Sequence, residues 1–242
     1  MSFLRMQESD EYWILRFAQN DVFKVFKHIK PSNQTRTKTM NTLPYDKNFL
    51  AEDLGSLEDA KIAILPAPYE YRVSWVEGAG KGPQAIIDAS AYVEFYDDEF
   101  DRELCFDKGL ATIEPLDFNR KVDKEALDHI RQNVTELLNK DKFVVTLGGG
   151  EHTISTAPIE AHFRKYPDMS ILHFDAHSDL RDSYEGSIYS HASFMSRTTE
   201  FFPPERVVQA GIRALCKEER DIIRNKGVKT FFANEIRRGV HG

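Results

Sequence analysis

The sequence predicts an α/β fold built on a parallel sheet. From residue 61 onward, short apolar or β-branched runs alternate with longer stretches, which is typical of strands joined by helices. The stretch 124–139 places Ala126, Ile130, Val134 and Leu137 at helical spacing, so one face of that helix should pack on the sheet. The 242 residues are sufficient for one large domain of this kind.

The expected elements follow one another in strand–helix order. Strands are predicted at residues 62–65, 143–147, 170–174, 206–210 and 229–232, with a weaker edge strand at 111–113. Helices are predicted at residues 82–95, 124–139, 153–164, 192–199 and 216–225. The sequence contains no internal repeat and neither of the glycine-rich loops that bind nucleotide phosphates, G-x-G-x-x-G and the P-loop.

The composition argues against several classes of protein. The net charge of -7 argues against a nucleic-acid binder that relies on a broad basic surface. No uninterrupted apolar run reaches the ~18 residues that a membrane helix needs. Cys105 and Cys216 are too few for a disulfide scaffold and form no C-x-x-C pair. We therefore expect a cytoplasmic protein that binds neither nucleic acid nor membranes.

The first 39 residues differ from the rest of the chain. They carry scattered aromatic residues and a polar stretch at 31–39, and they lack the apolar core of a secretory signal. We predict a poorly ordered N-terminal extension over residues 1–39, with an amphipathic helix over residues 12–28 as the alternative. Residues 40–242 are predicted to form the folded domain.

A glycine turn follows the strand predicted at 143–147. Gly148, Gly149 and Gly150 allow the backbone to turn sharply, and Glu151 and His152 come directly after them. Open α/β sheets bind ligands at the carboxyl ends of their strands, so His152 is a candidate site residue. The alternative is a simple turn that leaves an exposed histidine.

The strand predicted at 170–174 leads into a cluster of metal-ligand residue types. Asp175, His177 and Asp179 alternate along the chain, so their side chains could converge. Two carboxylates and an imidazole without a thiolate favour Mn²⁺ among the divalent metals. Unpaired charges just past a buried strand would be costly, which supports the metal interpretation. His173 has apolar neighbours and is predicted to be a core histidine.

Together these motifs resemble the ureohydrolase family, which includes arginases and agmatinases. Gly-Gly-Glu-His follows one strand and Asp-Ala-His-Ser-Asp follows the next. The similarity extends from residue 62 to residue 232 and is strongest to the agmatinase branch. Further matching segments are Pro66-Ala67-Pro68-Tyr69-Glu70, residues 78–87 and Ser190-His191-Ala192-Ser193-Phe194. The resemblance implies a three-layer αβα, arginase-like fold and a homo-oligomer.

The resemblance also implies a binuclear manganese centre and a reaction. His152 and Asp179 would hold one ion, His177 the other, and Asp175 would bridge both. The centre would activate water for attack on a guanidino substrate, and the expected reaction converts agmatine to putrescine and urea. His191 matches the family's loop histidine and is the candidate general acid or base. Glu151 is a candidate for orienting a histidine ring.

One family motif is missing from the sequence. The family's Asp-x-Asp-x-x-Asp segment is expected after Glu235, and the sequence contains no such pattern. We therefore expect a C-terminally truncated ureohydrolase domain over 40–242 with an incomplete sheet, an incomplete second metal site and negligible activity on its own. The alternatives are a guanidinobutyrase, formimidoylglutamase or arginase, or a non-catalytic remnant that acts as a metal-binding or interaction protein.

Overall fold

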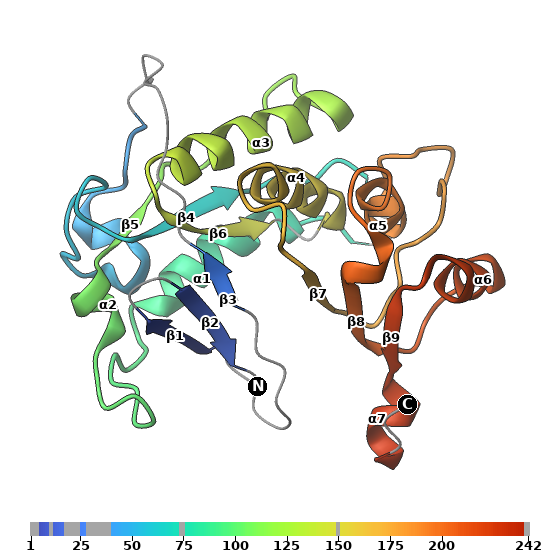
Figure 1. The fold of residues 1–242 in the computed structure, drawn as a ribbon. Helices are drawn as coiled ribbons and strands as arrows, with labels where there is room; N and C mark the ends of the chain where they lie inside the picture. The colour runs from blue at the N-terminus through green and yellow to red at the C-terminus, as the bar shows by residue number, and fades with distance from the viewer. Residues whose placement is uncertain are drawn as a thin grey trace.

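A computed structural model describes residues 40–72, 76–148 and 151–239, together with the backbone of three short strands nearer the N-terminus (Figure 1). The strands are β1 (Arg5–Ser9), β2 (Tyr12–Arg16), β3 (Val25–Lys27), β4 (Ile62–Ala67), β5 (Leu110–Thr112), β6 (Phe143–Gly148), β7 (Ile171–Phe174), β8 (Val207–Ile212) and β9 (Lys229–Phe232). The α-helices are α1 (Gly82–Ser90), α2 (Leu104–Lys108), α3 (Asp123–Asn139), α4 (Thr156–Lys165), α5 (Phe194–Thr198), α6 (Lys217–Lys226) and α7 (Ala233–Arg238).

The first parallel sheet has the strand order β5-β4-β6, with β4 in the centre. Ala63 and Leu65 of β4 are fully buried, as expected for a central strand covered on both faces. Helix α3 lies on one side of this sheet and α1 on the other (Figure 1). The stripe of α3 that the sequence predicts to be apolar, which includes Ile130 and Val134, is fully buried against the sheet.

The second parallel sheet has the strand order β7-β8-β9. Along β7, Ile171 and His173 are buried whereas Leu172 and Phe174 are exposed, so only one face of this strand is covered by the described residues. The core on the covered face combines Val207 of β8 with Phe194 and Met195 of α5 and Ile223 of α6.

The α/β class is confirmed, and the sheet differs from the expectation in one respect. Among the described residues β6 pairs only with β4, and β7 pairs only with β8, so two three-stranded sheets replace one continuous sheet. Helix α4 is part of the connection between β6 and β7 (Figure 1). Strands β6 and β7 are therefore edge strands, and neither has a ladder partner on its second side in the described part of the chain.

All of the predicted strands are present, whereas several helices have different bounds. The helix predicted at 82–95 ends at Ser90, whose buried hydroxyl donates to the carbonyl of Ile87 and accepts from the amide of Leu50. These side-chain bonds compete with continuation of the helix. Helices α2 and α7 are five and six residues long and carry too little periodicity to be predicted.

Glycine is required at Gly211, where β8 is irregular. Its φ of +94° lies in the left-handed region, and the pairing of β8 with β9 shifts register between Ala210 and Ile212. A Cβ at this position would lie 3.2 Å from the carbonyl oxygen of Asp175. The irregularity therefore brings the backbone of β8 close to the segment that follows β7.

The prediction for residues 1–39 falls largely outside the described residues. The backbone of β1, β2 and β3 forms an antiparallel sheet, so strands occupy Tyr12–Arg16 and Val25–Lys27 in place of the helix considered over 12–28. The boundary between an extension and a domain from residue 40 stays a prediction. In the described part of the chain, no helix has both the length and the apolar character of a membrane span.

Candidate metal centre

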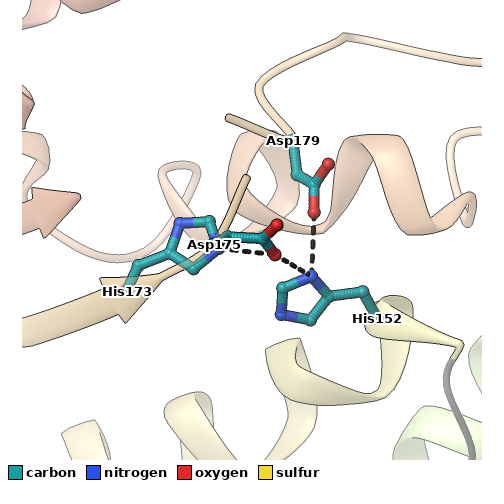
Figure 2. Close-up of side chains that lie close together, drawn as sticks. All are labelled: His152, His173, Asp175 and Asp179. Carbon is teal, nitrogen blue, oxygen red and sulfur yellow. Dashed lines mark hydrogen bonds and ion pairs between the residues drawn. The ribbon is translucent and has the colours of Figure 1, made fainter. Parts of the chain in front are cut away.

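Three of the predicted ligands meet at the carboxyl ends of β6 and β7. His152 begins a 3₁₀ turn (His152–Ser155) after β6, whereas Asp175 directly follows β7. The Nδ1 atom of His152 lies 2.8 Å from Oδ2 of Asp179 and 3.1 Å from Oδ2 of Asp175 (Figure 2). A Cβ added at Gly148 would lie 2.5 Å from Cδ1 of Ile154. The glycine therefore leaves room for Ile154, so the turn can pack against β6.

Asp175 presents its two carboxylate oxygens to different histidines. Oδ2 lies 3.1 Å from His152 and 3.3 Å from Nε2 of His173. Oδ1 accepts a 2.8 Å hydrogen bond from the backbone amide of His177 and lies 3.4 Å from its Nδ1. The carboxylate of Asp175 therefore faces His152 with one oxygen and His177 with the other.

His173 joins the cluster and His177 lies at its margin. The ligand atoms of His152, His173, Asp175 and Asp179 all lie within 4.8 Å of one another (Figure 2). His173 is buried, as the sequence predicts, but it also contacts Asp175, which was not predicted. The side chain of His177 is 65% exposed, because the chain leaves the strand direction after Asp175.

Asp179 is held in place by its backbone as well as by its side chain. Its φ of +53° is a left-handed conformation that aspartate tolerates better than most residues. Its carbonyl accepts from the amides of Met195 and Ser196 at 3.0 and 3.2 Å. The start of α5 thus fixes the position from which the carboxylate reaches His152.

The charges of the cluster shift the protonation of its members. Burial lowers the pKa of His152, but hydrogen bonds to Asp175 and Asp179 outweigh this and raise the pKa to about 9. Burial raises the pKa of Asp175, and the contacts with His152 and the amide of His177 more than reverse that effect, so this pKa lies well below its usual range. Burial, together with the charge on His152, lowers the pKa of His173. The metal-free cluster is thus a protonated His152 between two carboxylates.

His191 lies beside a buried carboxylate close to the cluster. Its Nδ1 is 3.7 Å from Oε1 of Glu151, and the ring of Tyr184 meets its ring edge-on at 5.8 Å. Oε2 of Glu151 accepts from the amide of Arg72 at 2.9 Å, whereas Oε1 is buried without a hydrogen bond among the described residues. Burial raises the pKa of Glu151, and the Arg72 amide and His191 act against that rise.

A cavity of about 750 Å³ joins these groups. Its lining includes His152, Asp175 and Asp179 as well as Glu151 and His191. Thr146 of β6 and Phe174 of β7 also line it, so residues of an edge strand from each parallel sheet border the cavity. The predicted ligands and the predicted proton-transfer residue therefore share one space.

A profile of the arginase family matches residues 60–241, three quarters of the chain. The chain belongs to the arginase family. The matched residues contain both parallel sheets and every member of the candidate centre.

The arginase-family relatives include two kinds of ureohydrolase. An N(1)-aminopropylagmatine ureohydrolase of Synechocystis is 36% identical over 196 residues, which are 78% of this chain and 63% of the relative. An agmatinase of Bacillus cereus is 38% identical over 180 residues, which are 73% of this chain and 60% of the relative. The chain thus spans about three fifths of the length of these relatives.

Solved arginase-family structures share the fold. The agmatine ureohydrolase of Thermoplasma volcanium matches with a TM-score of 0.71 and 25% identity, over 80% of this chain and 64% of that one. An arginase from Medicago truncatula matches with a TM-score of 0.66 and 27% identity, over 74% of this chain and 59% of that one. These matches confirm the arginase-like α/β fold that the sequence motifs imply.

The donor set of this arginase-family chain fits a divalent cation. Nδ1 of His152 lies 2.8 Å from Oδ2 of Asp179 and 3.1 Å from Oδ2 of Asp175, so one imidazole nitrogen and two carboxylate oxygens converge. Carboxylate oxygens with imidazole nitrogen suit Mn²⁺ and related ions. The chemistry of the side chains is therefore consistent with a metal centre.

Proposed function

We propose that this chain carries the metal-binding part of a manganese-dependent ureohydrolase that acts on agmatine. The observation that carries the proposal is the convergence of His152, Asp175 and Asp179 on a cavity that His191 also lines. The similarity to curated agmatinases supports the choice of substrate class. Because the chain spans three fifths of those relatives, the reaction itself is part of the proposal.

The proposed ligand roles are those that the family resemblance implies, and the positions of the side chains support them. His152 and Asp179 would hold one ion and His177 a second, and Asp175 would contact both because its two oxygens face different histidines. When bound, manganese supplies Lewis acidity that activates water toward the guanidinium carbon. The manganese itself, the homo-oligomer and the cytoplasmic location are further parts of this proposal.

His191 is the proposed proton-transfer residue. Hydrolysis joins the oxygen of water to the guanidinium carbon and breaks the bond from that carbon to the alkyl nitrogen. That nitrogen leaves as an amine only after it takes up a proton, and urea is the other product. His191 borders the cavity, and its Nδ1 lies 3.7 Å from Oε1 of Glu151, so its imidazole is placed to deliver that proton.

N(1)-aminopropylagmatine is the second candidate substrate. The relatives from Synechocystis and Thermus thermophilus are named for this compound, and their identity to the chain, 36% and 38%, is similar to that of the agmatinases. The two compounds share the guanidinium group and differ at the other end, so the same metal centre could serve either.

The test is a urea-release assay with excess Mn²⁺ on two proteins. One is the 242-residue chain, and the other is this chain joined near Glu235 to the remaining part of the Bacillus cereus agmatinase. We expect the joined protein to release urea from agmatine or N(1)-aminopropylagmatine, and the 242-residue chain to release very little. If the joined protein released urea from arginine alone, the proposed substrate would be wrong. If it released no urea from any guanidino compound, the proposed reaction would be wrong.

A further inference from the structure

Gln209 is a fully buried amide in the middle of β8, and four hydrogen-bond partners surround it. Its Nε2 donates to the carbonyl of Ser178 at 2.8 Å and lies 3.1 Å from Nδ1 of His173. Its Oε1 accepts from the hydroxyls of Ser178 and Thr230 at 3.3 and 3.2 Å. Because a carbonyl can only accept, the Ser178 carbonyl requires that the NH₂ group occupy the Nε2 position.

This orientation determines the tautomer of His173. The NH₂ group of Gln209 can only donate, so Nδ1 of His173 must accept and therefore carries no proton. A neutral His173 then has its proton on Nε2, which faces Oδ2 of Asp175 at 3.3 Å (Figure 2). The ring of Phe194 meets the His173 ring at 90° with centroids 5.1 Å apart, which restricts rotation of the imidazole.

Both ring nitrogens of His173 are therefore committed within the protein. The lone pair of Nδ1 accepts from Gln209, and Nε2 carries the proton donated to Asp175. A metal ligand needs a nitrogen lone pair that faces the ion, and His173 has none in this arrangement. Proximity alone thus includes His173 in the cluster, whereas its hydrogen bonds exclude it from the ligand set.

We propose that Gln209 fixes His173 as the Nε2-protonated tautomer, and that His173 is a positioning residue for the Asp175 carboxylate rather than a metal ligand. The role toward a cation rests on the proposed function, since it concerns how Asp175 is presented to the ion. The tautomer itself does not, because it is a property of the metal-free chain.

The first experiment reads the tautomer by nitrogen-15 NMR of histidine-labelled, metal-free protein at pH 8. The variant His173→Gln identifies the signals of His173. We expect wild-type His173 to show an unprotonated Nδ1 and a protonated Nε2. In Gln209→Glu a carboxylate replaces the NH₂ donor, so we expect a proton on Nδ1. Thr230→Val, which removes only a hydroxyl from the other side of the amide, should leave the tautomer unchanged. A protonated Nδ1 in the wild-type protein would overturn the inference without any variant.

The second experiment measures Mn²⁺ affinity by calorimetry. His173→Gln retains an amide donor for Asp175, whereas His173→Leu does not. We expect His173→Leu and Gln209→Glu to weaken binding about 10–100-fold, as loss of a partner of a metal ligand typically does. His173→Gln and Thr230→Val should retain affinity close to that of the wild type. An equal loss of Mn²⁺ affinity in His173→Gln and His173→Leu would show that His173 is a metal ligand, which would overturn the positioning role. If the wild-type protein binds no Mn²⁺, the proposed function fails while the NMR result still decides the tautomer.

Discussion

The phenyl ring of Phe194 lies against the imidazole of His152, with ring centroids 3.8 Å apart and planes inclined by 31°. The two residues after Phe194 donate their amides to the carbonyl of Asp179. The start of α5 therefore contacts a candidate ligand that follows β6 and a candidate ligand that follows β7. This short segment aligns residues from two different sheets.

The first prediction separates this alignment from ordinary packing. Phe194→Ala should lower the free energy of unfolding by about 3–5 kcal/mol, because the side chain is fully buried. It should also weaken Mn²⁺ binding at least about tenfold, since the His152 ring loses its support. Phe202→Ala is the matched control, because Phe202 is buried in the same core. For Phe202→Ala we expect a similar loss of stability and an unchanged Mn²⁺ affinity. Stability is measured by urea unfolding and affinity by calorimetry at low temperature. Equal metal affinities in the two variants would contradict the alignment.

The second prediction concerns the ranking of the ligands. Asp175→Ala should reduce bound manganese more than His152→Ala or Asp179→Ala, because the carboxylate of Asp175 faces both His152 and His177. Bound metal is counted by elemental analysis after dialysis. Asp98→Ala removes an exposed carboxylate remote from the cavity and should have no effect. Wild-type manganese content in Asp175→Ala would refute the assigned centre.

The third prediction uses the contact between Gly211 and Asp175. Gly211→Ala adds backbone strain at a positive φ and a Cβ 3.2 Å from the Asp175 carbonyl, so it should reduce both stability and Mn²⁺ affinity. Gly186→Ala is the control, because Gly186 has a φ of +78° but no atom within 4 Å of an added Cβ. It should lose about 1 kcal/mol of stability and retain its metal affinity. The affinities are compared by calorimetry, and identical losses in both variants would count against a role for the contact.

The fourth prediction tests His191 on the joined protein described above. Removing a proton-transfer residue typically lowers the rate about 10²–10⁴-fold, so we expect a loss of that size in kcat for His191→Ala. Manganese content should not change, because His191 is not among the four residues of the cluster. A His191→Ala variant that retains full turnover would remove His191 from the proposed mechanism.

The fifth prediction concerns pH and a histidine away from the centre. Burial lowers the pKa of His162, whose Nδ1 lies 2.7 Å from the carbonyl of Pro158. Because the folded state resists protonation of His162, this residue's contribution to the free energy of unfolding is fully present above pH 6.5, the ordinary pKa of histidine. The contribution is lost as the pH falls below that value. The slope can reach about 1.4 kcal/mol per pH unit for one proton.

His162→Gln isolates this contribution, because glutamine keeps an amide donor and does not titrate in this range. Urea unfolding between pH 8 and pH 5 should show a weaker pH dependence for the variant than for the wild type. Parallel curves would show that the protonation of His162 does not contribute.

The sequence predicted the strands and the ligand neighbourhood because both depend on local patterns. The apolar stripe of α3 is a periodic signal, and the run from Asp175 to Asp179 follows directly from a strand. The position of His173 could also have been found, since it lies two residues before Asp175 and therefore on the same side of β7. The family resemblance added the proposed role of His191.

Other features depend on contacts between distant residues. The pairing of Gln209 with His173 joins two strands, and the stack of Phe194 on His152 joins a helix to a turn. A glutamine within a β-branched strand was the one local hint of a buried polar role. The absence of a β6–β7 ladder from the described residues could not be read from strand propensity, which does not specify partners.

The two separate sheets have a consequence for the cooperativity of unfolding. Each sheet has its own core, and the donors of the candidate centre are divided between them, with His152 after one sheet and Asp175 after the other. A protein of this kind can open in units of different stability. A cation held by both donors stabilises only states in which the two units are folded together, by about 2.7 kcal/mol at a concentration of one hundred times Kd. Calorimetric melting should therefore show a broad or divided transition without manganese and one sharper transition with it, so the shape of the melting curve reports whether an ion connects the two halves.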